Sequence, residues 1–339
     1  MQLTTSRSVS VFSLLFSLFM SDCLFGSDTY LQRLPDEIEA VGGQGTAQSQ
    51  AGSVALNDTA ALRLNPAMLA TRRSYDLMGG YYWPSAGRPF YKAGVIDGVT
   101  SPIAMGFEYT GFQEQLKPLA QRQEIDSPVS RRISLGLAVP SQLFALGFAA
   151  HYVESEDITV PEGGAKPLKA IALGAGLLVP IGTGARIGVS IENFNNKRIA
   201  AVAPTTLRAG LSWEDSSKVL LVSADYRQRQ RSKILERPIA VGSAELAEPT
   251  VPVAAADNLQ EMASDPEKMG FVGMQATIYN LLRFFSSYGQ SLNGEDRSVV
   301  SGGLGLYQKN YTVAYAVSKK FPRQTELESS LQLSVIMKL

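Results

Sequence analysis

Thiols and imidazoles are almost absent from this chain of 339 residues, which contains one cysteine, Cys23, and one histidine, His151. A single cysteine excludes a disulfide framework, and together the two residues are too few for a thiolate-bound zinc or haem site. We therefore expect no metal ion and no other cofactor.

Charge is also scarce, because only 18% of the residues are charged, against roughly 25% in an average soluble protein. The 31 basic residues are balanced by 31 acidic ones. A neutral chain without a basic tract lacks the electrostatic footprint of a nucleic-acid-binding protein. Nucleic acid is therefore excluded as a partner.

Long apolar runs are missing except at the N-terminus, where a predominantly apolar stretch extends from Val9 to Met20. At about a dozen residues it is too short for a transmembrane helix. Arg7 precedes it and small or polar residues follow it, as in a secretory signal, so we expect residues 1–26 to be removed. A first core helix and lipidation of Cys23 are the alternatives, although Asp22 is unusual before a lipidated cysteine.

Residues 27–73 differ from the rest of the chain. Glycines interrupt this segment, Asn57 and Asp58 have the character of a helix N-cap, and Pro66 ends or kinks the helical turn that follows. The segment is predicted to form short helices without a core of their own. We expect it to pack against a larger domain, residues 74–339.

From residue 74 onward the apolar residues alternate with a period of two, as in strands. In residues 131–139, for example, large apolar side chains share one face while arginine, serine, glycine and alanine share the other. A soluble sandwich would place charged residues at most outward positions, whereas here the second face is small as often as it is charged.

Fourteen such segments are predicted, at 74–84, 90–97, 102–112, 130–139, 142–154, 168–180, 184–194, 203–213, 217–227, 268–279, 281–288, 297–308, 311–320 and 329–339. The connections after even-numbered segments are tight, and those after odd-numbered segments are mostly longer. An even strand count with this alternation is typical of an antiparallel transmembrane β-barrel in the outer membrane of a Gram-negative bacterium, surrounded by outer-membrane lipid.

Residues 52–70 carry a specific resemblance. The stretch from Asn57 and Asp58 to Asn65-Pro66-Ala67 resembles the N-terminal hatch of the FadL-type outer-membrane transporters, which carry fatty acids and other hydrophobic compounds. Residues 188–194, 207–213 and 302–306 resemble the same superfamily. The resemblance covers most of the chain after the signal and implies a hatch, or plug, inside the barrel.

Physical reasoning also favours a plug. A barrel of fourteen strands is wider than its own wall side chains can fill, and many positions on the predicted inner face are glycine or alanine. We predict that residues 27–73 lie in the lumen, with the Asn65 side chain bonding to backbone groups at the turn made by Pro66.

Charged residues on the predicted inner face should pair with one another or with the plug, because charge on the lipid face costs about 2–4 kcal/mol at the midplane. They are Asp76, Glu108, Arg132, Arg186, Glu192, Arg208, Asp225 and Arg283. We expect them to fix the plug more than to bind a substrate.

The sequence gives little indication of catalysis, since the chain contains neither a Gly-x-Ser-x-Gly elbow nor a phosphate-binding loop. An outer-membrane phospholipase would need a serine paired with His151 on the wall. We interpret His151 as a wall residue and expect no enzymatic activity.

Three functions remain. The favoured one is passive transport of small hydrophobic, fatty-acid-like molecules, released through the lumen or sideways into the bilayer. The first alternative is a barrel that serves protein export or surface attachment, as PorV-like relatives do, with residues 228–267 as a loop that could bind a protein partner. The second is a structural or general diffusion barrel.

Overall fold

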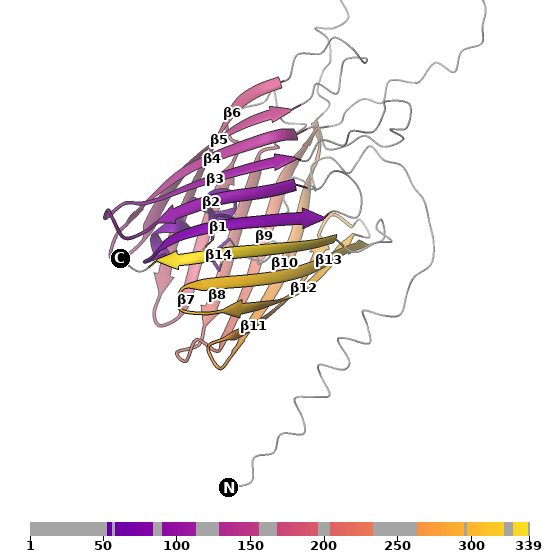
Figure 1. The fold of residues 1–339 in the computed structure, drawn as a ribbon. Helices are drawn as coiled ribbons and strands as arrows, with labels where there is room; N and C mark the ends of the chain where they lie inside the picture. Colours follow the sequence, from indigo (N-terminus) through magenta and orange to yellow (C-terminus); the bar gives the residue numbers. More distant parts are fainter. Residues whose placement is uncertain are drawn as a thin grey trace, which may run out of the picture.

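The computed structural model describes residues 53–55, 58–83, 90–112, 129–155, 168–195, 204–232, 263–294, 297–321 and 328–337. These residues include fourteen strands that form a closed barrel, in which each strand pairs antiparallel with the next and β1 pairs with β14 (Figure 1). The strands are β1 (Tyr75–Trp83), β2 (Phe90–Asp97), β3 (Ala104–Phe112), β4 (Val129–Pro140), β5 (Ala145–Ser155), β6 (Leu168–Ile181), β7 (Ala185–Glu192), β8 (Thr206–Glu214), β9 (Leu220–Ser232), β10 (Ala263–Ile278), β11 (Leu282–Ser291), β12 (Ser298–Tyr307), β13 (Tyr311–Phe321) and β14 (Glu328–Met337). The predicted antiparallel barrel is confirmed.

The strand boundaries agree with the predicted segments to within a few residues, except at the far ends of β9 and β10. Their pairing extends to Ser232 and Ala263, beyond the predicted limits of 227 and 268. The extension carries charge in place of apolar alternation, since Glu267 pairs with Arg229 across the two strands. Alternating hydrophobicity is the signal that predicts the strands, and here it ends before the ladder does.

The two faces of the wall differ in chemistry as the period of two predicts. On β4, Leu135 and Leu137 are 56% and 42% exposed, whereas Ser134 and Ala138 are fully buried on the inner side. Exposed leucine, phenylalanine and valine side chains recur on the outer face of nearly every strand. An apolar outer surface of this extent requires lipid around it.

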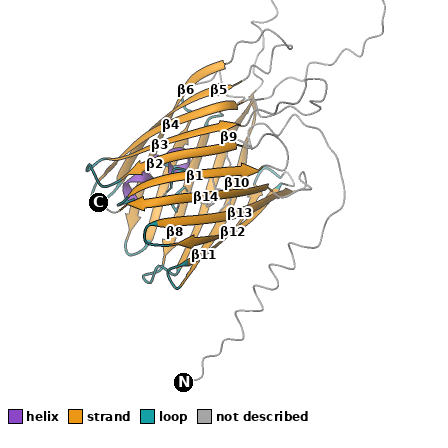
Figure 2. Ribbon diagram, viewed as in Figure 1, coloured by secondary structure: helices purple, strands orange, loops and turns teal. Residues whose placement is uncertain are grey.

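The connections after the even-numbered strands are the short ones, at 98–103, 141–144, 182–184, 215–219, 279–281 and 308–310. They lie at the same end of the barrel as the end of β14 (Figure 2). In the turn at 215–219, hydrogen bonds from the Ser217 hydroxyl and the Leu220 amide hold the pKa of Asp215 below its usual value. We call this end of the barrel the short-turn end.

Two short helical elements precede the barrel, α4 (Ala61–Leu64) and η2, a 3₁₀ helix (Pro66–Thr71). No helix in the described part of the chain is both long and apolar enough to cross a membrane. The predicted N-cap at residues 57–58 is wrong, because Ala60 occupies the N-cap position. The Asp58 carboxylate instead accepts a hydrogen bond from the Ala60 amide, which forms a tight turn immediately before α4.

Candidate functional site

The two helical elements lie inside the barrel near its short-turn end, where Figure 2 shows them in purple behind the strands. Residues 53–55 and 58–72, which we call the interior segment, contact inward-facing positions of the wall. Leu62, Met68 and Leu69 are fully buried there. Burying each of these side chains contributes about 1.5–3 kcal/mol.

Two rows of small residues on the inner wall make room for this segment. Gly106, Gly136 and Ala149 pair across β3, β4 and β5, and Ala138, Gly147 and Gly176 pair across β4, β5 and β6. All four strands, β3 to β6, contact η2.

The glycines in these rows are contact sites. A Cβ atom on Gly106 would lie 3.1 Å from Leu62 Cδ2 and 3.2 Å from Leu69 Cδ2. A Cβ atom on Gly147 would collide with the backbone of Pro66 and Ala67. The interior segment therefore touches the wall directly, without room for larger side chains between them.

Asn65 joins the two helical elements and is fully buried. Its side-chain oxygen accepts a hydrogen bond from the Ala67 amide at 3.1 Å, and its Nδ2 donates to the Leu177 carbonyl oxygen of β6 at 3.2 Å. Pro66, at the first position of η2, needs no amide partner there. The bond from Ala67 is the one that the sequence predicts for Asn65 at this turn.

A buried ion-pair cluster connects the segment to β7 and β8. Arg63 Nε lies 3.3 Å from Glu192 Oε1, and Arg208 Nη1 lies 3.0 Å from Glu192 Oε2. Arg208 also donates to the Arg63 carbonyl oxygen at 3.4 Å. All three side chains are at most 6% exposed, so two buried guanidinium groups share one carboxylate.

Further hydrogen bonds join the interior segment to β2 and β14. Lys92 of β2 donates to Thr59 at 3.3 Å and to Glu108 at 3.4 Å, and Gln332 of β14 donates to Asp58 at 3.3 Å. These bonds hold the start of the segment to the wall on the side opposite the Glu192 cluster. Other bonds of the same kind connect Ser53 to Asp225, Ser190 to the Leu64 carbonyl, Ser212 to the Val54 carbonyl and Arg72 to Asp76.

The structure places all the predicted inner charges at inward-facing positions. Asp76, Glu108, Arg132, Glu192, Arg208 and Asp225 are buried. Arg186 is 28% exposed near the short-turn end and pairs with Glu214 at 3.4 Å, and Arg283 lies 3.8 Å from the ring centre of Tyr307. Of the predicted plug residues, Asp58, Asn65, Pro66 and Ala67 are buried in the barrel, and Asn57 lies outside the described residues.

A second charged cluster, which the sequence pattern did not predict, lies at the end of the barrel away from the short turns. Glu267 of β10 lies 3.6 Å from Arg227, 3.4 Å from Arg229 and 3.5 Å from Arg297. The alternating arginines at 227, 229 and 231 are the signal that could have revealed it, but the sequence suggests a loop there. Three guanidinium groups therefore gather around this carboxylate.

Apolar side chains adjoin this second cluster. The Arg227 guanidinium lies 5.2 Å from the ring centre of Phe271, and its Nη2 lies 2.9 Å from Met269 Sδ. Met269 and Phe271 pack together with Val299 from β12. An arginine cluster beside an apolar patch suits a molecule with an acidic head and an apolar body.

His151 is within hydrogen-bonding distance of a serine, because its Nδ1 lies 2.9 Å from Ser134 Oγ of the neighbouring strand. Both side chains face the interior and are buried, at 1% and 0% exposed. A lipid in the surrounding membrane has no route to atoms buried on the inner side of the wall. The pair joins β4 to β5 as wall residues.

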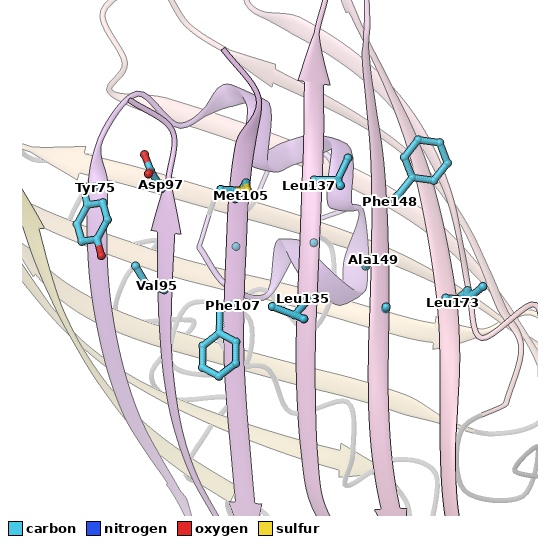
Figure 3. Close-up of a pocket in the computed structure, with 13 residues that line it drawn as sticks. Tyr75, Val95, Asp97, Met105, Phe107, Leu135, Leu137, Phe148, Ala149 and Leu173 are labelled. Atoms are coloured by element: carbon cyan, nitrogen blue, oxygen red, sulfur yellow. The ribbon is translucent and has the colours of Figure 1, made fainter. Parts of the chain in front are cut away.

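On the outer face, a groove of about 580 Å³ lies on strands β1 to β6 (Figure 3). Its apolar sides are formed by outward-facing residues of β3 to β6, among them Met105, Leu137 and Phe148. Tyr75 and Asp97 lie at the end of the groove next to the short turns.

Comparison with solved structures shows the same fold. The chain is similar to a protein described as the CymD monoaromatic hydrocarbon channel, with a TM-score of 0.56 and 15% identity over 87% of this chain and 96% of that one. A second match is the toluene transporter TodX of P. putida, with a TM-score of 0.49 and 11% identity over 88% and 97% of the two chains. No family model matches the sequence, and no curated protein matches it.

The barrel fold that the sequence predicts is therefore shared with the CymD channel. The closed barrel and its apolar outer surface place the chain in the outer membrane of a Gram-negative bacterium. In such barrels the short turns face the periplasm.

Proposed function

We propose that this outer-membrane barrel is a passive transporter for small hydrophobic molecules of the fatty-acid-like class, with residues 1–26 as a signal peptide, 27–73 as a plug and 74–339 as the barrel. The observation that carries the proposal is the way the interior segment fills the short-turn end. Its contacts with the wall on opposite sides, through Glu192 and through Lys92, support a plug that restricts free diffusion.

The preference for a hydrophobic molecule with an acidic head rests on the cluster around Glu267. Arg227, Arg229 and Arg297 bring three guanidinium groups together around Glu267, and Met269 and Phe271 provide an adjoining apolar surface. A carboxylate head would bind the guanidinium groups while its apolar body packs on the Met269 and Phe271 side chains.

The monoaromatic hydrocarbon named in the description of CymD belongs to the same broad class of apolar molecules. We extend that class to this chain because its wall has the same fold and its lumen combines apolar and basic side chains. Release from the lumen would occur at the short-turn end or sideways into the bilayer.

Binding of a fluorescent fatty acid and of its neutral methyl ester to the purified protein tests this function. We expect saturable binding of both probes, with the acid bound more tightly. Arg229→Gln should weaken binding of the acid about tenfold, which corresponds to one charge-assisted hydrogen bond, and should leave the ester unchanged. Arg186→Gln, at the opposite end, is the matched control and should leave both unchanged.

Absence of saturable binding by a folded barrel would contradict the transport proposal. It would favour the PorV-like alternative, in which the plug only seals the lumen and residues 228–267 bind a protein partner. Equal weakening by Arg229→Gln and Arg186→Gln would remove the head-group part of the proposal.

A further inference from the structure

The groove on the outer wall has the form of a channel between two ridges of side chains. Met105, Leu137 and Phe148 pair in register across β3, β4 and β5 and form one ridge. Phe107, Leu135 and Leu173 lie on the second ridge, two residues away along their strands (Figure 3). Residues two apart on a strand are separated by about 7 Å, which is the spacing between the two ridges.

No side chain projects from the floor of the groove between the ridges. Gly106, Gly136 and Ala149 form it with backbone, because these residues carry little or no side chain and face inward. Ala150, which faces outward, interrupts the second ridge with a small side chain. The groove volume of about 580 Å³ falls within the range of roughly 300–1,000 Å³ of sites that bind small molecules.

The groove extends from the membrane surface toward the middle of the bilayer. Its first residues, Tyr75 and Asp97, are the terminal residues of β1 and β2 at the short turns and pair with each other. Further along, Leu137 lies three residues before the end of β4 at Pro140, and Leu173 lies eight residues before the end of β6 at Ile181. The groove therefore lies farther from the short-turn end on β4 than on β2, and farther again on β6.

Charges of both signs stand where the groove begins. Asp97 is held at the rim by hydrogen bonds that its Oδ1 accepts from the Val99 and Thr100 amides, both at 3.0 Å. Its Oδ2 accepts one hydrogen bond, from the Thr100 hydroxyl, and keeps a second lone pair, so Asp97 can still accept a bond from a cation. Arg73 is exposed, and its backbone lies next to the turn that follows Asp97, because the Ser74 carbonyl oxygen accepts a hydrogen bond from the Gly98 amide at 3.1 Å.

We propose that this groove binds one glycerophospholipid with an ethanolamine head group, from the periplasmic leaflet. Arg73 binds the phosphate, Asp97 binds the ammonium, and one acyl chain lies between the two ridges. Each head-group charge is opposite in sign to the side chain that binds it and lies at the periplasmic membrane surface, while the apolar part of the groove lies at the depth of the acyl chains.

Native mass spectrometry of the full-length protein, with dioleoyl phosphatidylethanolamine or dioleoyl phosphatidylglycerol added, tests the proposal. Ala150→Trp fills the groove, and the matched control Ala224→Trp adds the same side chain to the outer face of β9. We expect the groove variant to retain about tenfold less phosphatidylethanolamine than the control. Asp97→Asn should lower retention of phosphatidylethanolamine but not of phosphatidylglycerol, which lacks the ammonium.

Equal retention of phosphatidylethanolamine by Ala150→Trp and Ala224→Trp would overturn the site. Equal loss of both lipids in Asp97→Asn would overturn the assignment of the ammonium to Asp97. Arg73→Gln should lower retention of both lipids, because both carry the phosphate, and unchanged retention would overturn the role of Arg73. Thermal unfolding of each variant in detergent shows whether the barrel is intact.

Discussion

The glycines of the inner wall decide how closely the interior segment approaches the strands. Gly147 is the most restrictive of those that touch Pro66 and Ala67, because the obstacle there is backbone, which cannot rotate away as a side chain can. Gly79, on β1, has open space within 4 Å of the position that a Cβ atom would take, and it serves as a reference.

Gly147→Ala should therefore lower the free energy of unfolding by about 1–3 kcal/mol, the usual cost of overpacking. Gly79→Ala should change it by no more than about 0.5 kcal/mol. Urea unfolding of both variants, followed by tryptophan fluorescence in lipid vesicles, measures the difference. A Gly147→Ala barrel as stable as Gly79→Ala would show that the interior segment does not sit against β5.

Glu192 is the acid that lies between two buried arginines, Arg63 and Arg208. Glu192→Gln removes the carboxylate that both guanidinium groups share, and we expect a loss of about 3–5 kcal/mol in unfolding free energy. Glu214→Gln removes the partner of Arg186 where both side chains are more than a quarter exposed, and should cost at most about 1 kcal/mol. Denaturant titration of both variants gives the two values, and similar losses would contradict the buried cluster.

At the scale of elements, α4 and η2 are too short to be stable alone, with four and six residues. They depend on the wall and on the side chain of Asn65, which bonds to the start of η2 and to β6. The stability of both elements therefore depends on the Asn65 side chain between them.

Asn65→Ala should remove both hydrogen bonds and leave the Leu177 carbonyl buried without its side-chain donor, at a cost of about 1–3 kcal/mol. Amide hydrogen exchange of residues 66–71 should accelerate. Thr71→Ala, which removes one hydrogen bond to the Met68 carbonyl at the partly exposed end of η2, should affect exchange less. Unchanged exchange in Asn65→Ala would mean that the wall alone holds η2.

Strands and turns could be predicted from the sequence because a membrane wall repeats one simple rule, with large apolar side chains outward and small or polar ones inward. Residues 131–139 follow this rule throughout, and β4 lies where it was expected. The outer ends of β9 and β10 could not be predicted, since charge pairing between Arg229 and Glu267 replaces the apolar alternation there.

The site was predictable in part. The alternation of inward and outward positions along each strand predicted that Glu192, Arg208 and Asp225 lie on the inner face. It could not predict their partners, because contacts such as that of Arg63 with Glu192 join residues 129 positions apart. The outer groove was not predicted either. It depends on the register between neighbouring strands, which a segment pattern does not specify.

The molecule as a whole combines a closed wall, an interior segment held at the short-turn end and, beyond it, the arginine cluster around Glu267 with its adjoining apolar patch. Such a barrel should restrict ions while it admits small hydrophobic molecules that bind the lumen. Removal of the plug should leave the barrel wall intact, because the strand ladder closes through the pairing of β1 with β14.

Single-channel conductance in a planar bilayer tests the plugged channel most directly, with the intact protein and a variant lacking residues 28–70. A heat-dependent shift in gel mobility first confirms that both barrels have assembled. We predict that the intact protein is closed or passes only small, brief currents, and that the deletion opens a stable pore. An intact protein that conducts as well as the deletion variant would contradict the plugged channel.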